Sequence, residues 1–247
     1  MITVLIPMAS RSSYFPETDF PVPVPLINVG SKLMIELVLK NFSELYENVR
    51  FIFVISRSDC NKYHLDKTLK LLTNGDAKIV IIENETKGAA CSALMALDHI
   101  DLKENLIISN SDQIFERSAL RRLKSFDNID AGVLTFNSVH PRWSYVAVTK
   151  EGKVVEAAEK KPLSNNAIAG LYFFKQGKFF VDAAKDMILK GDSVNGLFYI
   201  APVINQIILS GKMVIAENID ENLYHGFYNT QKIKEYENFL LKTQNLQ

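Results

Sequence analysis

Two polar segments of this 247-residue chain have the composition of phosphate-binding loops. Residues 7–15 (PMASRSSYF) are mostly small, so their backbone N–H groups could approach phosphate oxygens closely, and Arg11 could add a positive charge. In residues 86–90 (TKGAA), Gly88 allows the close approach of a flat base or a phosphate, although a glycine in an ordinary turn would look the same. Both segments are therefore candidates for holding a nucleotide.

A carboxylate follows one of the most apolar runs of the chain. Asp112 lies in residues 109–113 (SNSDQ), where it could hold Mg²⁺ that bridges phosphate groups. The alternative is that Asp112 caps a turn or the helical region at 118–123. The residues around it leave both interpretations open.

A third group of polar residues lies in the second half of the chain. Residues 159–162 (EKKP) offer a carboxylate for sugar hydroxyls and an ammonium for a phosphate, or form a solvated run of charges. Asn166 follows, and Gly170 lies in a predicted strand, where a glycine often marks a bulge or a close ligand. Trp143 and Tyr145 could stack on a sugar ring or pack in the core.

Composition excludes several classes of function. The 28 basic and 28 acidic residues balance, which removes the electrostatic reason to expect nucleic acid or an anionic membrane as a partner. No apolar run approaches the roughly 20 residues that a membrane helix needs. Two cysteines, Cys60 and Cys91, are too few for a disulfide framework. With no leader peptide apparent, we expect a cytoplasmic protein.

The elements that must position these residues follow from the hydrophobic pattern. Four short apolar runs are typical of strands buried on both faces of a parallel sheet: residues 2–7, 50–56, 78–82 and 105–109. Helical spacing between them, at 32–42 and 89–99, predicts an α/β sheet. Ligands of such sheets bind outside the carboxyl ends of the strands, where the candidate residues of the first half lie.

After residue 130 the pattern becomes mixed. We predict strands at 131–136, 145–149, 154–158, 168–174 and 213–217, and helices at 178–190, 199–209 and 230–241. The Glu-Gly pair within 150–153 predicts a hairpin, and Asn229 or Thr230 caps the last helix. No linker interrupts the chain, so we predict one α/β domain with a Rossmann-like mixed sheet flanked by helices. A homodimer is plausible because the apolar late strands could pair.

Taken in order, the segments resemble the sugar-phosphate nucleotidyltransferases, which make nucleoside-diphosphate sugars, and in particular the stand-alone enzymes of bacterial capsule and cell-envelope synthesis. The segments that carry the resemblance are Leu5–Ala9, Pro25–Leu39, Glu85–Leu94, Ile108–Glu116, Trp143–Val148, Ala158–Phe174 and Phe198–Lys212. The resemblance implies the fold shared with GT-A-type enzymes. It also implies that residues of about 1–130 bind the nucleotide and about 131–247 the sugar phosphate.

The resemblance further implies a role for individual residues. Asp112 would bind Mg²⁺ and act in catalysis with Lys161, and Asn229 stands at the position of a second metal-binding acid. Arg11 could act in catalysis as a substitute for an arginine of the family that this chain lacks. The nucleotide would contact Met8, Ala9, Ser10, Ser12, Ser13, Thr86, Gly88 and Ala89. The sugar phosphate would contact Asn110, Tyr145, Glu159, Lys160, Asn166 and Gly170, with Lys160 an alternative to Lys161. A sugar-1-phosphate oxygen would attack the α-phosphorus of a nucleoside triphosphate and release pyrophosphate.

The chain departs from this family where the triphosphate would bind. Ser10, Ser12 and Tyr14 stand where the family has two glycines and an arginine, and Val24 replaces a catalytic lysine between two prolines. Leu197 replaces a glutamate. Three hypotheses therefore stay open: a working nucleotidyltransferase, a GT-A-type glycosyltransferase that uses a nucleotide sugar, and a catalytically impaired homologue that binds or regulates.

Overall fold

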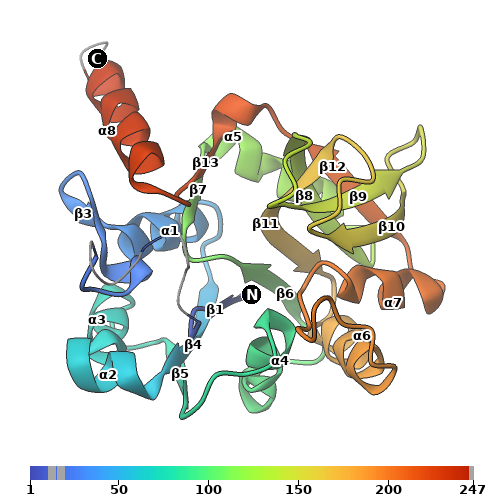
Figure 1. Cartoon of the computed structure of the whole chain (residues 1–247), viewed down its shortest axis with the longest axis horizontal. Coiled ribbons are helices and arrows are strands. Elements are labelled where there is room, and N and C mark those ends of the chain that lie inside the picture. Colours follow the sequence, from blue (N-terminus) through green and yellow to red (C-terminus); the bar gives the residue numbers. More distant parts are fainter. Residues whose placement is uncertain (11–14, 16–19, 245–247) are drawn as a thin grey trace.

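A computed structural model describes residues 1–10, 15 and 20–244, and its centre is a nine-stranded mixed sheet (Figure 1). Four strands of the first half are parallel: β1 (Ile2–Pro7) pairs with β4 (Val49–Ser56) and β6 (Asn105–Ser109), and β4 pairs with β5 (Lys78–Ile82). All four strands predicted for this half are confirmed, with β4 beginning one residue earlier.

Strand β1 is buried on both faces, as its continuous apolar sequence predicts. Ile2, Val4 and Ile6 belong to a core cluster that also contains buried residues of α1 (Met34–Ser43) and α3 (Leu65–Leu72). Leu5 points into a second cluster, with residues of α4 (Ala89–Leu94) and α6 (Gly177–Leu189). Helices therefore cover both faces of the sheet, and its carboxyl edge is the place left for a ligand.

The strands of the second half extend the same sheet. The hairpin is confirmed, because β9 (Ser144–Val148) and β10 (Val154–Glu159) pair antiparallel. The long strand β11 (Asn166–Phe174) pairs antiparallel with β6 and with β8 (Ala131–Asn137), and β12 (Val214–Asn218) lies parallel to β8. Parallel and antiparallel pairing in one sheet confirms the predicted mixed α/β fold.

Two predicted helices are shorter than the pattern indicates. The helix expected at 89–99 ends at Leu94 and is followed by a 3₁₀ turn, Leu97–His99. The helix expected at 199–209 is α7 (Val203–Leu209), which begins after Pro202. Proline lacks an N–H and is favoured at a helix start, so the helix begins next to Pro202 and residues 199–201 lie outside it.

Other elements were missed because they are short. Helix α2 (Arg57–Tyr63) begins where the Ser56 hydroxyl accepts the Asp59 N–H, 3.1 Å away, and His64 in the left-handed region (φ 53°) separates α2 from α3. Small pairs of strands were missed as well. They are β2 (Asn28–Val29) with β3 (Lys32–Leu33), and β7 (Gln113–Phe115) with β13 (Tyr224–Gly226).

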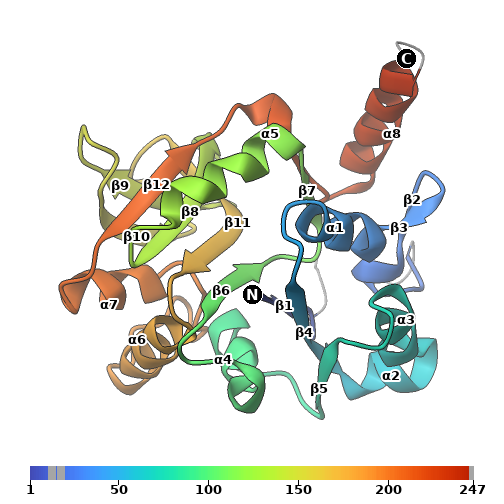
Figure 2. The same ribbon diagram turned by 180° about the vertical axis from the view of Figure 1, so that it is seen from behind.

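The remaining elements lie around these strands. Helix α5 (Arg117–Leu120) continues into a 3₁₀ turn at Arg121–Phe126, and further 3₁₀ turns span Val24–Leu26 and Glu221–Leu223. The terminal helix α8 (Thr230–Gln244) lies beyond β7 and β13, at the opposite end of the molecule from α6 and α7 (Figures 1 and 2). Among the helices described, none has the length and apolar character needed to cross a membrane.

The outer edges of the late strands are bonded within the chain. The Asn205 side chain both donates to and accepts from the backbone of Ala157 in β10, at 2.8 Å each. In β12, the Ala216 N–H donates to the Gly152 carbonyl at 3.0 Å. These backbone groups are therefore not available for the strand pairing on which the expected homodimer was based.

Candidate functional site

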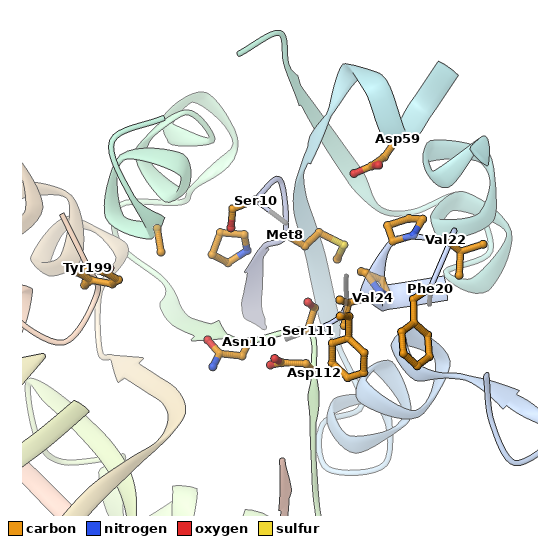
Figure 3. A pocket seen from close by; sticks show the side chains of 15 residues that line it. Met8, Ser10, Phe20, Val22, Val24, Asp59, Asn110, Ser111, Asp112 and Tyr199 are labelled. Carbon is orange, nitrogen blue, oxygen red and sulfur yellow. The ribbon is translucent and has the colours of Figure 1, made fainter. Parts of the chain in front are cut away.

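A cavity of about 380 Å³ lies at the carboxyl ends of β1 and β6 (Figure 3). It joins segments that are far apart in the sequence: the loop after β1, the segment around Val24, the turn after β6, and the beginning of α4. The residues described around it are Pro7, Met8, Ser10, Phe15, Phe20, Val22, Pro23, Val24, Pro25, Asp59, Ala89, Asn110, Ser111, Asp112 and Tyr199. Five candidate residues of the first half thus converge where the sheet topology predicts a ligand: Met8, Ser10, Ala89, Asn110 and Asp112.

The loop after β1 contributes Met8 and Ser10 to the cavity. The Met8 N–H donates to the Val54 carbonyl at 2.9 Å and so continues the pairing of β1 with β4. Met8 is buried, whereas Ser10 is exposed. Ala9 points into the core beneath the sheet and does not contribute to the cavity lining. Arg11, Ser12, Ser13 and Tyr14 lie outside the described residues.

Asp112 lies in the turn between β6 and β7, and its side chain lines the cavity beside Asn110 and Ser111 (Figure 3). The side chain is partly buried, and desolvation raises the pKa of the carboxyl from 3.8 to about 6, against the smaller opposing effect of its own backbone N–H. It does not cap the following helix, which begins after Glu116. A helix cap is therefore excluded, and a role of this carboxylate in binding a ligand stays a prediction.

The turn that carries Asp112 is held from behind by β11. The Gly170 carbonyl accepts two hydrogen bonds, from the Asn110 N–H at 3.0 Å and from the Gln113 side chain at 2.9 Å. Gly170 has φ +61°, at an irregularity in the pairing of β11 with β8, and a Cβ atom there would collide with both the Asn110 and the Gln113 side chain. Gly170 is buried. Gly170 therefore supports the turn, and these contacts account for it without the sugar contact that we predicted.

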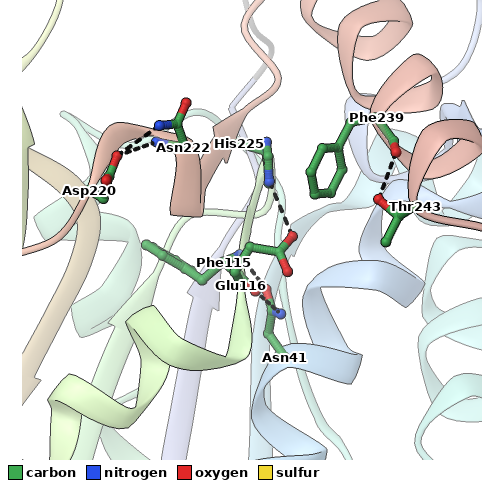
Figure 4. Close-up of polar contacts among 8 residues, drawn as sticks. All are labelled: Asn41, Phe115, Glu116, Asp220, Asn222, His225, Phe239 and Thr243. Atoms are coloured by element: carbon green, nitrogen blue, oxygen red, sulfur yellow. Dashed lines mark hydrogen bonds and ion pairs between the residues drawn. The ribbon is translucent and has the colours of Figure 1, made fainter. Parts of the chain in front are cut away.

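A second support comes from β7. Asn41 of α1 donates to the Phe115 carbonyl at 2.8 Å and accepts the Phe115 N–H at 2.9 Å, and His225 Nε2 of β13 lies 3.2 Å from Glu116 Oε1 (Figure 4). The Phe227 N–H donates to the backbone carbonyl of Asp112 at 2.7 Å. Asp112 therefore projects from a turn that is fixed on three sides.

Gly88, at the beginning of α4, faces the backbone of Phe198. The Phe198 N–H donates to the Lys87 carbonyl at 2.7 Å, and the Ala90 N–H donates to the Phe198 carbonyl at 3.0 Å. Gly88 has φ +105°, and a Cβ atom there would collide with the Phe198 backbone. The chain's own close approach accounts for this glycine without a base. Ala89 lines the cavity.

Thr86 closes the loop before α4. Its hydroxyl donates to the Gly88 carbonyl at 3.0 Å and lies 2.6 Å from the Ser92 hydroxyl. These contacts make Thr86 part of the loop's internal bonding, and it is not among the residues that line the cavity.

The charged residues after β10 take different positions. Glu159 accepts a hydrogen bond from the Ser144 hydroxyl, and burial raises the pKa of its carboxyl, against the opposing effects of Ser144 and Lys160. Lys160 Nζ donates to the Tyr199 hydroxyl at 2.9 Å, and Tyr199 lines the cavity. Lys160 and Lys161 are both exposed to solvent, and among the described contacts only Lys160 bonds to a residue of the cavity lining. The structure therefore connects Lys160, rather than Lys161, to the cavity.

Tyr145 requires a correction. It is completely buried, with 0% of its surface exposed, and its hydroxyl donates to the His140 carbonyl at 2.7 Å. Its ring packs in the core, so the prediction that Tyr145 lines the sugar side is wrong. Asn166, at the start of β11, donates from its backbone and side chain to the Ser164 hydroxyl, at 2.9 and 3.5 Å, and is not among the lining residues.

Asn229 caps the last helix. Its side-chain oxygen accepts the Lys232 N–H at 2.9 Å, as an N-cap does. It lies two residues after Phe227, which bonds to the backbone of Asp112, so the chain brings the two candidate metal ligands into the same region. Within the ranges described, no group of three or more His, Cys, Asp or Glu side chains could hold a metal ion.

Several further lining residues escaped the sequence-based prediction, Tyr199 among them. Asp59 follows the end of β4, and its Oδ2 accepts from the Ser56 hydroxyl at 2.8 Å. The carboxyl-end rule that selected Asp112 would also have found it. Phe20 and Val22 add apolar surface beside Val24 (Figure 3). Nothing in the local pattern distinguishes these two from core residues.

No curated protein matches this chain. Among solved structures, the chain is similar to a nucleoside-diphosphate-sugar pyrophosphorylase from Vibrio cholerae, with a TM-score of 0.84 and 19% identity over 95% of this chain and 99% of the other. It is also similar to the inositol-1-phosphate CTP transferase from T. maritima, with a TM-score of 0.72 and 17% identity over 95% and 93% of the two chains.

A third similar structure is a Bacillus anthracis protein assigned as a glucose-1-phosphate thymidylyltransferase and solved with sucrose, with a TM-score of 0.73 and 16% identity over 97% of this chain and 95% of the other. At these identities the three structures establish the fold. The family model for nucleotidyl transferases matches residues 20–210. With most of its length matched, the chain belongs to the nucleotidyl transferase family.

Proposed function

We propose that this enzyme joins a nucleoside triphosphate to a sugar 1-phosphate and releases pyrophosphate. A phosphate oxygen of the sugar phosphate forms a bond to the α-phosphorus, and the bond from that phosphorus to the oxygen bridging to the β-phosphate breaks. Pyrophosphate leaves with the electron pair, and no covalent enzyme intermediate is required. The family match supports nucleotidyl transfer, and the names of two similar structures suggest phosphorylated sugars or polyols as acceptors.

The observation that carries this proposal is the convergence on one cavity of Asp112, the loop after β1 and the start of α4. Met8 and Ser10 lie on one side and Ala89 on another. We assign the nucleotide to this region and the sugar phosphate to the region of Glu159 and Lys160, which corresponds to residues of about 1–130 and 131–247. Positioning two phosphorylated substrates next to each other is the main requirement of such a transfer.

The donor set of the site fits Mg²⁺. Proteins commonly hold Mg²⁺ through one or two carboxylates, with substrate phosphates and water as the other ligands. Asp112 supplies a partly buried carboxylate, and desolvation is the main cause of its raised pKa. The Asn229 oxygen already caps α8, so we assign the metal to Asp112 and the phosphates. Bound there, Mg²⁺ would neutralise phosphate charge during the transfer.

The product would be an activated sugar, which is the kind of donor consumed in capsule and cell-surface glycan assembly. A cytoplasmic location would give the enzyme access to nucleoside triphosphates.

The test is a pyrophosphate-release assay on the purified chain. ATP, CTP, GTP, UTP and dTTP are each combined with glucose, mannose, galactose and N-acetylglucosamine 1-phosphates and inositol 1-phosphate, with and without Mg²⁺. We expect Mg²⁺-dependent release with one base, lost in Asp112→Ala. The absence of release from every pair would contradict the proposal.

A second candidate is a glycosyltransferase that uses a nucleotide sugar. The observation that favours it is the cavity lining, which contains no Lys or Arg among the residues described and places Val24 near Asp112. Such an enzyme holds a diphosphate and needs fewer cations than one that binds a triphosphate. Thermal shift with UTP, UDP and UDP-glucose, each with Mg²⁺, separates the two, because the glycosyltransferase would be stabilised by the diphosphate compounds and not by the triphosphate.

A further inference from the structure

The Lys160 ammonium contacts Tyr199 at the hydroxyl end of its ring. Its Nζ donates to the Tyr199 hydroxyl at 2.9 Å and lies 4.8 Å from the centre of the ring. This charge-assisted hydrogen bond restricts where the ammonium can be. Lys160 is exposed to solvent and is not among the lining residues described, but Tyr199 lines the cavity, beside Asn110, Ser111 and Asp112.

The backbone on both sides of this contact is fixed. Lys160 has φ +54°, in the left-handed region that non-glycine residues rarely adopt, and its N–H donates to the Trp143 carbonyl at 3.0 Å. The chain therefore turns sharply at the end of β10. Tyr199 follows Phe198, which exchanges backbone hydrogen bonds with the start of α4. Figure 3 shows Tyr199 on the side of the cavity opposite Val24 and Phe20.

We infer that Tyr199 is a positioning residue: it holds the Lys160 ammonium at the edge of the cavity, where Lys160, and not Lys161, binds the phosphate of the acceptor. The inference rests on the nucleotidyl transfer proposed above. An ammonium has three N–H donors, so it can bond to a tyrosine hydroxyl and to phosphate oxygens together. Because Tyr199 is anchored to α4, the contact also links the region assigned to the nucleotide with the region assigned to the sugar phosphate.

A double-mutant cycle in the full-length enzyme tests the coupling. Lys160→Gln removes the charge, and Tyr199→Phe keeps the ring while removing the hydroxyl. With the substrate pair that gives turnover in the assay above, Lys160→Gln should raise KM for the sugar phosphate about tenfold or more, and Tyr199→Phe about threefold. The KM for the nucleotide should change by less than about twofold, because a charge that acts on the acceptor leaves the other substrate bound.

The double variant decides whether Tyr199 acts through Lys160. We expect its KM for the sugar phosphate to equal that of Lys160→Gln alone, and we expect Lys160→Arg to restore part of the loss. Lys161→Gln should have a smaller effect than Lys160→Gln, and Lys150→Gln, an exposed lysine of the β9–β10 hairpin, should match the wild type. A general loss of structure would instead lower the melting temperature and the apparent kcat without a selective rise in KM for the sugar phosphate, and that result would overturn the inference.

The outcomes separate this inference from the reaction on which it rests. An additive cycle, or a larger effect of Lys161→Gln than of Lys160→Gln, in a wild type that turns over, overturns the inference and leaves nucleotidyl transfer intact. A wild type that releases no pyrophosphate and is not stabilised by any triphosphate overturns the reaction and the inference with it.

Discussion

Asp112 places a carboxylate where a neutral side chain would be accommodated at lower cost. Its pKa in the folded chain, about 6, is above the ordinary value of 3.8, so the folded chain binds more protons between these values and loses stability as the pH rises through them. The cost is then fully present at neutral pH in the metal-free protein. A residue kept at such a cost is typical of a site that needs the charge for binding or catalysis.

Replacing this carboxyl should separate stability from function. We expect Asp112→Asn to stabilise the metal-free protein by about 1–3 kcal/mol at pH 8, and by about 1 kcal/mol less at pH 5, while abolishing transfer. Urea unfolding of both proteins in EDTA at the two pH values measures the difference. An equal stability of wild type and variant at pH 8 would contradict the stated cost of burial.

Val24 offers the converse experiment, in which a charge is added. It lines the cavity near Asp112 where the resemblance to sugar-phosphate nucleotidyltransferases implies a lysine. If a triphosphate binds beside it, Val24→Lys should tighten triphosphate binding about tenfold through a charge-assisted contact, and high salt should weaken the gain. Isothermal titration with the active triphosphate measures it. Val24→Met is the control, and an equal gain from methionine would show that the added charge is not responsible.

At the scale of elements, strand β11 positions the turn that carries Asp112. Gly170 is left-handed and leaves no room for a Cβ atom, because Asn110 and Gln113 pack directly against it. Gly191 has a similar φ, +68°, but open space around it. The two glycines therefore form a matched pair in which only one has neighbours to displace.

We expect Gly191→Ala to cost about 1 kcal/mol, which is the price of a left-handed alanine, and Gly170→Ala to cost about 1–3 kcal/mol more. Because the displaced residues flank Asp112, Gly170→Ala should also lower kcat, whereas Gly191→Ala should leave it unchanged. Urea unfolding and the pyrophosphate assay measure the two effects. Equal costs for both variants would show that the turn yields to the added methyl group.

The sequence predicted the elements whose side chains are periodic, and several residues that follow buried strands line the cavity as expected. The strands β1, β5 and β6 were located to the residue, and Asp112 was found because it follows β6 directly. What could not be predicted depends on contacts between distant segments. Tyr199 lines the cavity from the segment before Pro202 and α7, where its neighbour Phe198 bonds to the start of α4. Tyr145 was predicted to line the sugar side, but in β9 of the hairpin its side chain is buried in the core.

At the scale of the molecule, one sheet joins the two halves of the chain. Strand β11 pairs with β6 from Leu171 opposite Ser109 to Phe174 opposite Leu106, so the turn bearing Asp112 begins where the halves meet. A site assembled across this pairing depends on both halves being folded. The outer strands then have to be closed, because an open strand edge pairs readily with another chain.

Asn205 closes the edge of β10 through its two hydrogen bonds to Ala157. We expect Asn205→Ala to destabilise the protein by about 1–3 kcal/mol, because it leaves a backbone N–H and a carbonyl without protein partners. The uncovered edge should also promote self-association that grows with concentration. Sedimentation velocity across a concentration series measures it, with Asn238→Ala, on the exposed face of α8, as the control. A wild-type dimer that Asn205→Ala leaves unchanged would show that the chain associates through another surface, since strand pairing at β10 requires the groups that Asn205 occupies.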